Sequence, residues 1–159
     1  MAKQLRKSWR EKLLNAKGLP KVGPVTGKMT QRWGKRVMVI PAPTEVDALM
    51  KRVPKGRLVT INELRGALAA KHNADFACPI TTGIFSWIAA HAADEAAQAG
   101  AKRITPYWRT LKTGGEINPK YPGGTSAIAE QLRAEGHRIV QKGKRTVVMD
   151  YEKAVYRGL

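Results

Sequence analysis

Residues 104–124 read ITPYWRTLKTGGEINPKYPGG, and this stretch decides how the rest of the chain is interpreted. A Pro-aromatic-aromatic-Arg cluster at 106–109 is followed by one glycine pair at 114–115 and by a second at 123–124. Glycine pairs mark tight turns, so the stretch looks like a loop that forms the wall of a binding site. It contains no Cys, no His and no set of metal ligands, which indicates binding without chemistry.

Two helices are predicted upstream of this loop. Thr60-Ile-Asn-Glu63 is a capping box, in which the hydroxyl and the carboxylate each bond a free backbone amide, and it predicts a helix over 60–72. A longer helix follows over about 81–98, and residues 104–118 predict a hairpin around the first glycine pair. Two helices joined by a short turn and followed by a hairpin are typical of a winged helix-turn-helix.

The remaining elements make the expected fold α+β, with small β additions around the winged helix-turn-helix. They are a helix at 3–15, an irregular basic linker at 18–36, a strand at 36–40, a helix at 44–53 capped by Thr44, a helix at 126–135 capped by Ser126 and a hairpin at 137–150. The chain then divides into a basic N-terminal helix and linker arm (1–36), a winged-helix domain (37–136) and a C-terminal hairpin and tail (137–159).

The composition points to a polyanionic partner. Lys and Arg number 29 and Asp and Glu 12, which gives the 159 residues a net charge of +17. Such an excess repels itself in a compact state, so nucleic acid is the first candidate partner. No run approaches the ~18 consecutive apolar residues of a membrane span, so we expect no membrane partner. The single cysteine, Cys78, excludes an internal disulfide and suits the cytoplasm, at the nucleoid if the chain is prokaryotic.

The charge is concentrated at the N-terminus. Residues 1–36 hold 11 basic residues and one acid, a net charge of +10, whereas residues 37–159 carry +7. Leu5, Trp9 and Leu13 lie on one face of the helix expected there. A basic arm beside a milder globular body is typical of nucleic-acid binding, and the alternative is a solubilising tail.

Five motifs follow one another in a specific order between about residues 46 and 136. They are VPKGR (53–57), VT (59–60), ITPYWR (104–109), KYPGG (120–124) and LRAEG (132–136). In this order they resemble the DNA-binding domain of the O6-alkylguanine-DNA alkyltransferases (methylated-DNA-protein cysteine methyltransferases) and of their alkyltransferase-like relatives. The resemblance implies that double-stranded DNA is the partner and that the protein acts in DNA repair. A repair protein is a further candidate partner.

The active-site loop departs from the alkyltransferase pattern. In true alkyltransferases it reads Pro-Cys-His-Arg, and the Cys accepts the alkyl group of a flipped guanine. Tyr107 and Trp108 stand at those places here, and neither a phenol with an ordinary pKa near ~10 nor an indole replaces a thiolate. The resemblance therefore implies a non-enzymatic, alkyltransferase-like protein. Its lesion pocket would be formed by Tyr107, Trp108 and Arg109, and Arg109 would have a structural role.

Two further departures concern base flipping. The family's second helix begins with an arginine that enters the duplex, and Thr82 is at the corresponding place. The tyrosine that rotates a phosphate in the family is replaced by Ile61. This chain therefore lacks two side chains that the family uses to move a base out of the stack.

Small polar and basic side chains are predicted to contact DNA. They are Arg57, Thr60, Thr81, Thr82, Ser86, Lys102, Arg103 and Lys112. Ordinary helix caps and a solvated face are the alternative interpretations. We expect Ile84, Phe85 and Ile88 to form the buried stripe of the second helix. Tyr107 either stacks on a base or fills the space that the missing Cys vacates.

The sequence leaves several functions open. The leading hypothesis is a non-enzymatic DNA-binding protein of the alkyltransferase-like type that recognises alkylated or damaged bases. The alternatives are a general DNA or RNA binder without lesion recognition, an enzyme that transfers an alkyl group to Cys78, and a protein adaptor that keeps the fold as a scaffold. No cofactor is expected. The histidines lie far apart without a Cys or carboxylate at ligand spacing, so no metal site is expected either.

Overall fold

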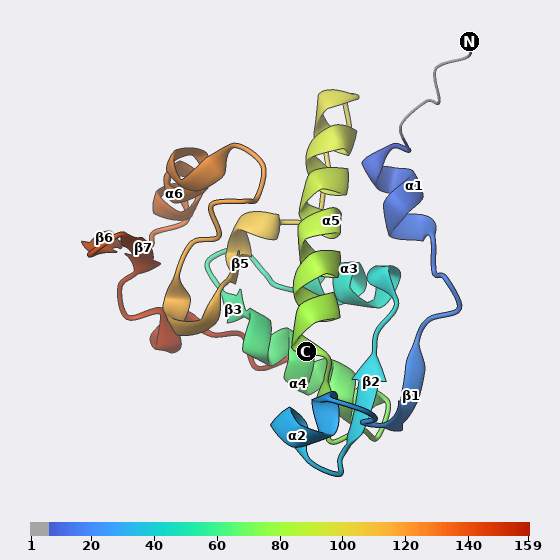
Figure 1. Ribbon diagram of the computed structural model, residues 1–159. Coiled ribbons are helices and arrows are strands. Elements are labelled where there is room, and N and C mark those ends of the chain that lie inside the picture. The colour runs from blue at the N-terminus through green and yellow to red at the C-terminus, as the bar shows by residue number, and fades with distance from the viewer. Residues whose placement is uncertain (1–6) are drawn as a thin grey trace.

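A long helix, α5 (Pro79–Gln98), runs through the centre of the protein, and the other elements gather around it (Figure 1). The structure, a computed structural model, describes residues 7–159. Helices α1 (Trp9–Leu14), α3 (Pro43–Lys51) and α4 (Ile61–Lys71) all contact α5. Short strands complete a mixed α+β fold, as the sequence predicts.

One main core lies between these helices and the segments that follow α5. Its largest fully buried side chains come from α3, α4, α6 (Gly124–Ala134) and the intervening loops, and they are Met50, Leu58, Leu64, Leu68, Leu111, Ile117, Ile128 and Leu132. The buried core residues of α5 are alanines, so its backbone lies close to its neighbours there, and the half-buried Phe85 and Trp87 pack against the same core. No helix between residues 7 and 159 is long and apolar enough to cross a membrane.

The first turn of α4 forms as the capping box predicts. Thr60 Oγ1 accepts the backbone N–H of Asn62 at 3.2 Å, and Glu63 Oε2 accepts that of Thr60 at 3.0 Å. Helix α5, however, begins at Pro79 and not at the threonines that follow it. Proline suits the first helical position because its missing N–H would have no partner there.

Two other helix starts differ from the prediction. Helix α3 begins at Pro43, one residue before the expected cap, and Glu45 Oε1 accepts the N–H of Ala42 at 3.0 Å. Helix α6 begins after Gly123, which has φ +81°, and not after Ser126. A Cβ at Gly123 would lie 2.7 Å from that of Ala127, so this turn requires glycine.

The segment expected to be an irregular linker is folded, so that prediction is wrong. Strand β1 (Lys21–Pro24) pairs antiparallel with β2 (Val37–Ile40), and β2 pairs parallel with β4 (Phe76–Ala77). Helix α2 (Met29–Trp33) lies in the β1–β2 connection. Gly and Pro dominate the local pattern, but partners distant in the sequence pair with this segment. Of the helix expected at 3–15, the structure has α1, and Leu5 lies outside the described residues.

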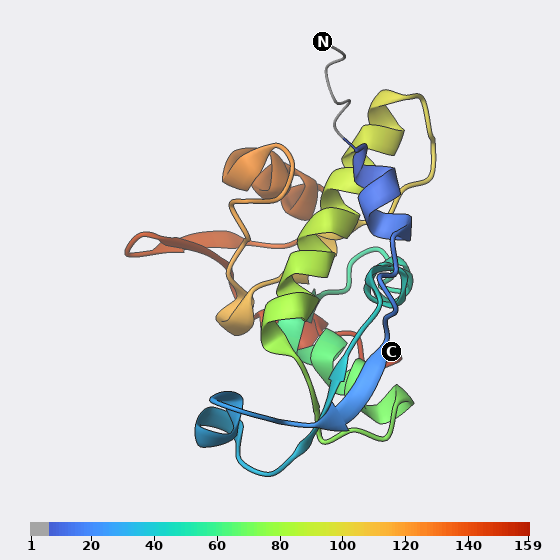
Figure 2. The same cartoon turned by 45° about the vertical axis from the view of Figure 1, so that its right-hand side comes forward.

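The wing expected at 104–118 does not form within that fully described segment. Tyr107–Arg109 is a 3₁₀ turn, β5 (Thr110–Leu111) pairs parallel with β3 (Val59–Thr60), and a second 3₁₀ turn spans Thr113–Gly115. The hairpin predicted at 137–150 is present as β6 (Ile139–Lys142) and β7 (Arg145–Val148). It extends away from the body, and Ile117 N–H donates to its Thr146 carbonyl at 2.9 Å (Figure 2). A last 3₁₀ turn spans Tyr151–Ala154.

Candidate nucleic-acid interface

A cleft opens between the first half of α5, the start of α4 and the loop 111–121. The inner part, about 340 Å³, is lined by Ile61, Gly83, Ser86, Leu111, Lys112, Thr113, Glu116, Asn118 and Tyr121. The outer part, about 700 Å³, is lined by Ile80, Gly83, Ile84, Trp87, His91, Lys112, Asn118, Pro119 and Lys120. The two parts share three residues and therefore adjoin.

The lining of the cleft combines apolar surface with two cations and one carboxylate, that of Glu116, which lies 3.7 Å from the Lys112 ammonium. Ile80 and Ile84 are large aliphatic residues with exposed fractions of 54% and 46%, and both project from the first two turns of α5. Lys112 and Lys120 lie in the loop opposite. Such a site suits a flat, partly apolar group that carries phosphate, because the rings find apolar walls and the phosphate finds ammonium groups.

Helix α5 presents the opposite face to the one expected. Thr82 and Ser86, predicted to contact DNA, are 0% and 1% exposed. Thr82 Oγ1 donates to the Cys78 carbonyl at 2.7 Å, and Ser86 Oγ donates to that of Gly83 at 2.8 Å. Because the helix backbone satisfies both hydroxyls, they can be buried, and Ile84 faces solvent instead. The prediction that Ile84 is buried is wrong, whereas Phe85 packs against the main core as predicted. The burial of Thr82 contradicts the DNA contact predicted for it, while Ser86 lines the inner part of the cleft.

Tyr107 is enclosed by the protein, with 5% of its surface exposed. Its ring packs edge-on against those of Trp108 and Tyr121, at centroid distances of 5.4 and 6.3 Å. Burial and the nearby Asp94 carboxylate raise the pKa of Tyr107. It does not line either part of the cleft. In this structure the ring fills internal space, which contradicts its predicted place on the wall of a lesion pocket.

Trp108 and Arg109 are held by one carboxylate, that of Glu135. Arg109 donates from Nε to Oε1 and from Nη2 to Oε2, both at 2.9 Å, and Trp108 Nε1 donates to Oε2 at 2.8 Å. Arg109 Nη1 also donates to the Val53 carbonyl at 2.9 Å, and Gly56 N–H donates to Glu135 at 3.2 Å. Both residues therefore connect the loop to α6 and to the turn before β3, instead of facing a ligand.

The Glu135 carboxylate is held ionised by these donors. Burial alone would raise its pKa, but the hydrogen bonds from Arg109, Trp108 and Gly56 outweigh burial and lower it below the ordinary value. Tyr121 shows the simpler case, since burial raises its pKa to about 12. Its hydroxyl donates to Ser86 Oγ at 3.0 Å and connects the inner cleft to α5.

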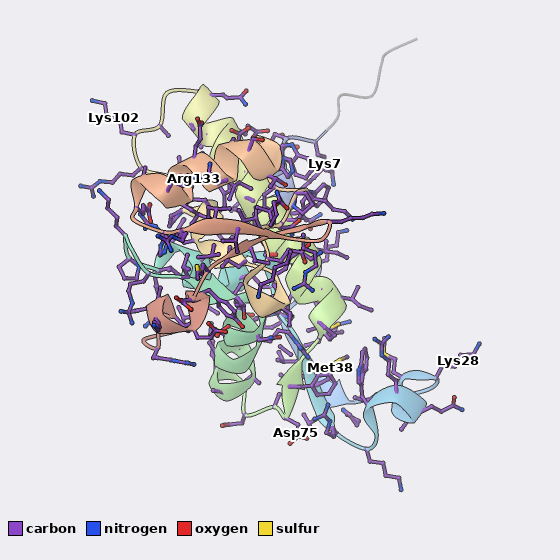
Figure 3. The ribbon with its side chains drawn as sticks, turned by 90° about the vertical axis from the view of Figure 1, so that its left-hand side faces the viewer. Lys7, Lys28, Met38, Asp75, Lys102 and Arg133 are labelled. Atoms are coloured by element: carbon purple, nitrogen blue, oxygen red, sulfur yellow. The ribbon has the colours of Figure 1, made fainter. Side chains whose placement is uncertain are left out.

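The other predicted DNA contacts are scattered. Thr60 is buried in its capping box, and the Thr81 hydroxyl is buried without a hydrogen-bond partner among the described residues. Arg57 donates to the Val155 carbonyl at 3.0 Å. Lys102 and Arg103 are exposed, but they follow the C-terminal end of α5. This helix of 20 residues is about 30 Å long, and the cleft lies beside its N-terminal half. Figure 3 shows Lys102. Of the predicted set, Lys112 lines both parts of the cleft and the buried Ser86 lines the inner part.

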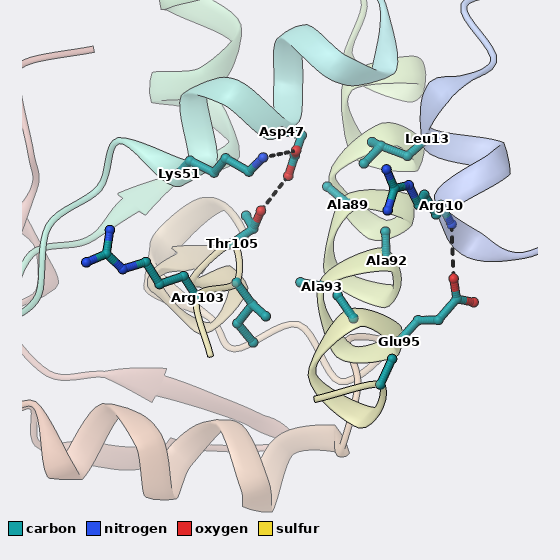
Figure 4. Close-up of a pocket in the computed structure, with 13 residues that line it drawn as sticks. Arg10, Leu13, Asp47, Lys51, Ala89, Ala92, Ala93, Glu95, Arg103 and Thr105 are labelled. Atoms are coloured by element: carbon teal, nitrogen blue, oxygen red, sulfur yellow. Dashed lines mark hydrogen bonds and ion pairs between the residues drawn. The ribbon is translucent and has the colours of Figure 1, made fainter. Parts of the chain in front are cut away.

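A separate hollow of about 290 Å³ lies between α1, α3 and α5 (Figure 4). Its buried acid, Asp47, accepts the Thr105 hydroxyl at 2.6 Å and pairs with Lys51 at 3.1 Å. Arg10 and Arg103 lie at its edge, and alanines of α5 form its floor. Partners within the protein already bind the Asp47 carboxylate, which connects α3 to the loop before Tyr107.

Cys78 lies away from the cleft lining. It is 3% exposed and packs with Val25, Met38 and Phe76 in a small second core. No group of three or more His, Cys, Asp or Glu side chains that could hold a metal occurs between residues 7 and 159.

The sequence did not single out His91 or Lys120 as residues of the cleft's outer rim. Trp87 Nε1 and His91 Nε2 each hydrogen-bond with the Lys120 carbonyl, at 3.2 and 3.1 Å, and Trp9 of α1 stacks on the His91 ring at 4.4 Å. The KYPGG motif could have pointed to Lys120. No local signal indicates that α1 would dock beside it.

Comparisons with known proteins were made for the sequence and for the fold. No family model and no curated protein matches the sequence. Among solved structures, the fold is similar to that of Atl1 from S. pombe, whose crystal structure is in complex with damaged DNA containing O6-carboxymethylguanine. The TM-score is 0.52 at 16% identity, and the match covers 72% of this chain and 94% of that one. The chain thus has a mixed α+β fold of the Atl1 type.

Proposed function

We propose that this protein binds double-stranded DNA without reacting with it, and that the cleft beside α5 receives an alkylated or otherwise damaged base. The observation that carries the proposal is the cleft itself, in which exposed Ile80 and Ile84 face Lys112 and Lys120. The inner part, at about 340 Å³, falls within the ~300–1,000 Å³ usual for small-ligand sites. Atl1, an alkyltransferase-like protein with a similar fold, was crystallised with damaged DNA.

The non-enzymatic part of the proposal is supported by what surrounds the two residues that a transfer reaction would need. Tyr107, which the resemblance aligns with the acceptor cysteine, is buried and packs against the rings of Trp108 and Tyr121. The Cys78 thiol, the alternative acceptor, is buried in another core. The proposal also includes a cytoplasmic location and action together with a repair protein.

The test compares affinities for matched duplexes with and without O6-methylguanine across a salt series, followed by mass spectrometry of the protein. We expect tighter binding of the lesion duplex and an unchanged protein mass. A methyl group gained on Cys78 would overturn the non-enzymatic assignment.

Equal affinity for both duplexes would instead favour a general nucleic-acid binder. One observation supports this second function: the buried Tyr121 lines the inner part of the cleft and the buried Tyr107 ring packs against it, so aromatic side chains occupy space that an extruded base would need.

A further inference from the structure

Residues 21–40 form a small basic unit, called here the basic knob, that consists of β1, α2 and β2. It carries five cations and no acid, and all five cations are exposed: Lys21, Lys28, Arg32, Lys35 and Arg36. In the part of the chain that the structure describes, no ion pair within 4.0 Å engages any of them. Their charge is therefore available to an external anion.

The knob is an ordered element and not a loose tail. Val25, Met38 and Phe76 form its core with Cys78, and Trp33 packs against them. The Arg36 guanidinium lies 4.3 Å from the centre of the Phe76 ring, and its Nε donates to the Trp33 carbonyl at 3.1 Å. The one carboxylate at the knob's base, that of Asp75, accepts the Val37 N–H at 2.7 Å. The cations are thus displayed on a folded platform.

The basic knob lies next to the cleft. Strand β4 pairs with β2 and leads through Cys78, a member of the knob's core, directly into the first turn of α5. Both ribbon views place α2 at the end of α5 where that helix begins (Figures 1 and 2). Lys28 projects outward from this end, away from the body of the molecule (Figure 3). A duplex bound at Ile80 and Ile84 would continue past this surface.

We propose that the basic knob is a second DNA-contact surface, which binds the phosphate backbone of the duplex beside the cleft. This inference rests on the proposed function. Phosphates fit because the knob offers five exposed cations within 20 residues, none of them ion-paired within the described part of the chain. The N-terminal arm then has two roles. Helix α1 is bound to α5, where Glu95 accepts the N–H groups of Trp9 and Arg10, and the knob contacts DNA.

The experiment compares two variants of equal net charge. The knob variant is Lys28→Gln/Arg32→Gln/Lys35→Gln, and the control is Arg138→Gln/Lys142→Gln/Lys144→Gln, three exposed cations on or beside the β6–β7 hairpin. Duplex affinity is measured from low to moderate salt. Each lost phosphate contact lowers the slope of log K against log salt by about one, so we expect a loss of up to about three for the knob variant and little change for the control.

Two readouts separate this inference from the proposed function. The ratio of lesion to undamaged affinity should be the same in the knob variant as in the unaltered protein, because phosphates carry no lesion information. Equal slopes for the knob variant and the unaltered protein, with duplex still bound, would overturn the inference alone, as would equal losses in both triple variants. Failure of the unaltered protein to bind any duplex would overturn the proposed function and this inference together. Melting temperatures check that both variants are folded.

Discussion

Tyr107, which the sequence resemblance aligns with the reactive cysteine of the alkyltransferases, packs its ring edge-on against those of Trp108 and Tyr121. A base cannot stack on a ring that the protein encloses, and only 5% of Tyr107 is exposed. The surroundings of the residue thus favour a packing role over recognition.

Replacing Tyr107 by alanine should lower stability and leave lesion preference unchanged. Truncation of a buried aromatic ring costs about 3–5 kcal/mol, which a melting curve resolves. Tyr107→Phe is the matched control, since it keeps the ring. A tenfold loss of lesion preference at an unchanged melting temperature would contradict the packing role.

The buried ion pair between Arg109 and Glu135 connects the loop to α6, and its contribution to stability can be tested. Arg109→Met should destabilise the protein by about 3–5 kcal/mol, since it leaves a buried carboxylate without its cation. Arg133→Met, an exposed cation on α6, serves as the control and should change stability by less than about 1 kcal/mol. Similar losses from both variants, measured in urea, would show that the pair is not a structural link.

At the scale of the element, α5 combines a buried polar and alanine face with exposed aliphatic side chains. It buries Thr82, Ser86 and a row of alanines, and it exposes Ile80 and Ile84. Exposed aliphatic side chains at the start of a helix, next to cations, suit a minor groove, where such residues act as wedges between base steps. Lys112 and Lys120 would then lie within reach of phosphate.

The double variant Ile80→Ala/Ile84→Ala should therefore weaken duplex binding by roughly tenfold, ~1.4 kcal/mol, with little effect on stability because both side chains are exposed. Met149→Ala removes a similarly exposed side chain beside the C-terminal hairpin and should leave binding unchanged. Fluorescence anisotropy measures both. Unchanged binding in the double variant would place the DNA on another surface.

At the scale of the whole molecule, two carboxylates connect elements that are distant in sequence. Glu135 joins α6 to the loop at Arg109, and Glu45 joins α3 to the end of α4 through Lys71 and His72, each at 2.7 Å. For both acids burial would raise the pKa, but hydrogen bonds and opposite charges outweigh burial, and the pKa is lowered.

Acid should accordingly unfold the protein. A carboxyl group whose folded pKa lies below its unfolded value stabilises the fold at pH above the unfolded pKa of about 4.3. That stability is lost as the pH falls from there through the folded pKa. Urea unfolding between pH 6 and 3 should show this decline, and Glu135→Gln should reduce its steepness. An equally steep decline of stability with falling pH in the variant would show that the fold does not stabilise the Glu135 carboxylate.

The sequence by itself determined the elements whose signals are local. The Thr60 capping box, the length of α5, the C-terminal hairpin and the basic arm depend on neighbouring residues and on composition, and the patterns revealed them. The order of the VPKGR, ITPYWR and KYPGG motifs pointed to a fold of the type that Atl1 has.

Only the tertiary structure decided which face of α5 is buried and whether residues 18–36 fold. The alanine-rich helix has apolar residues on several sides, so close packing against α3 and α1 selects its orientation. The bonds of Thr82 and Ser86 to their own helix backbone allow these hydroxyls to be buried. Strand β1 exists because β2, itself paired with β4, offers it a free edge. Pairing and packing between segments distant in sequence leave no local signature, and the cleft and the basic knob both depend on them.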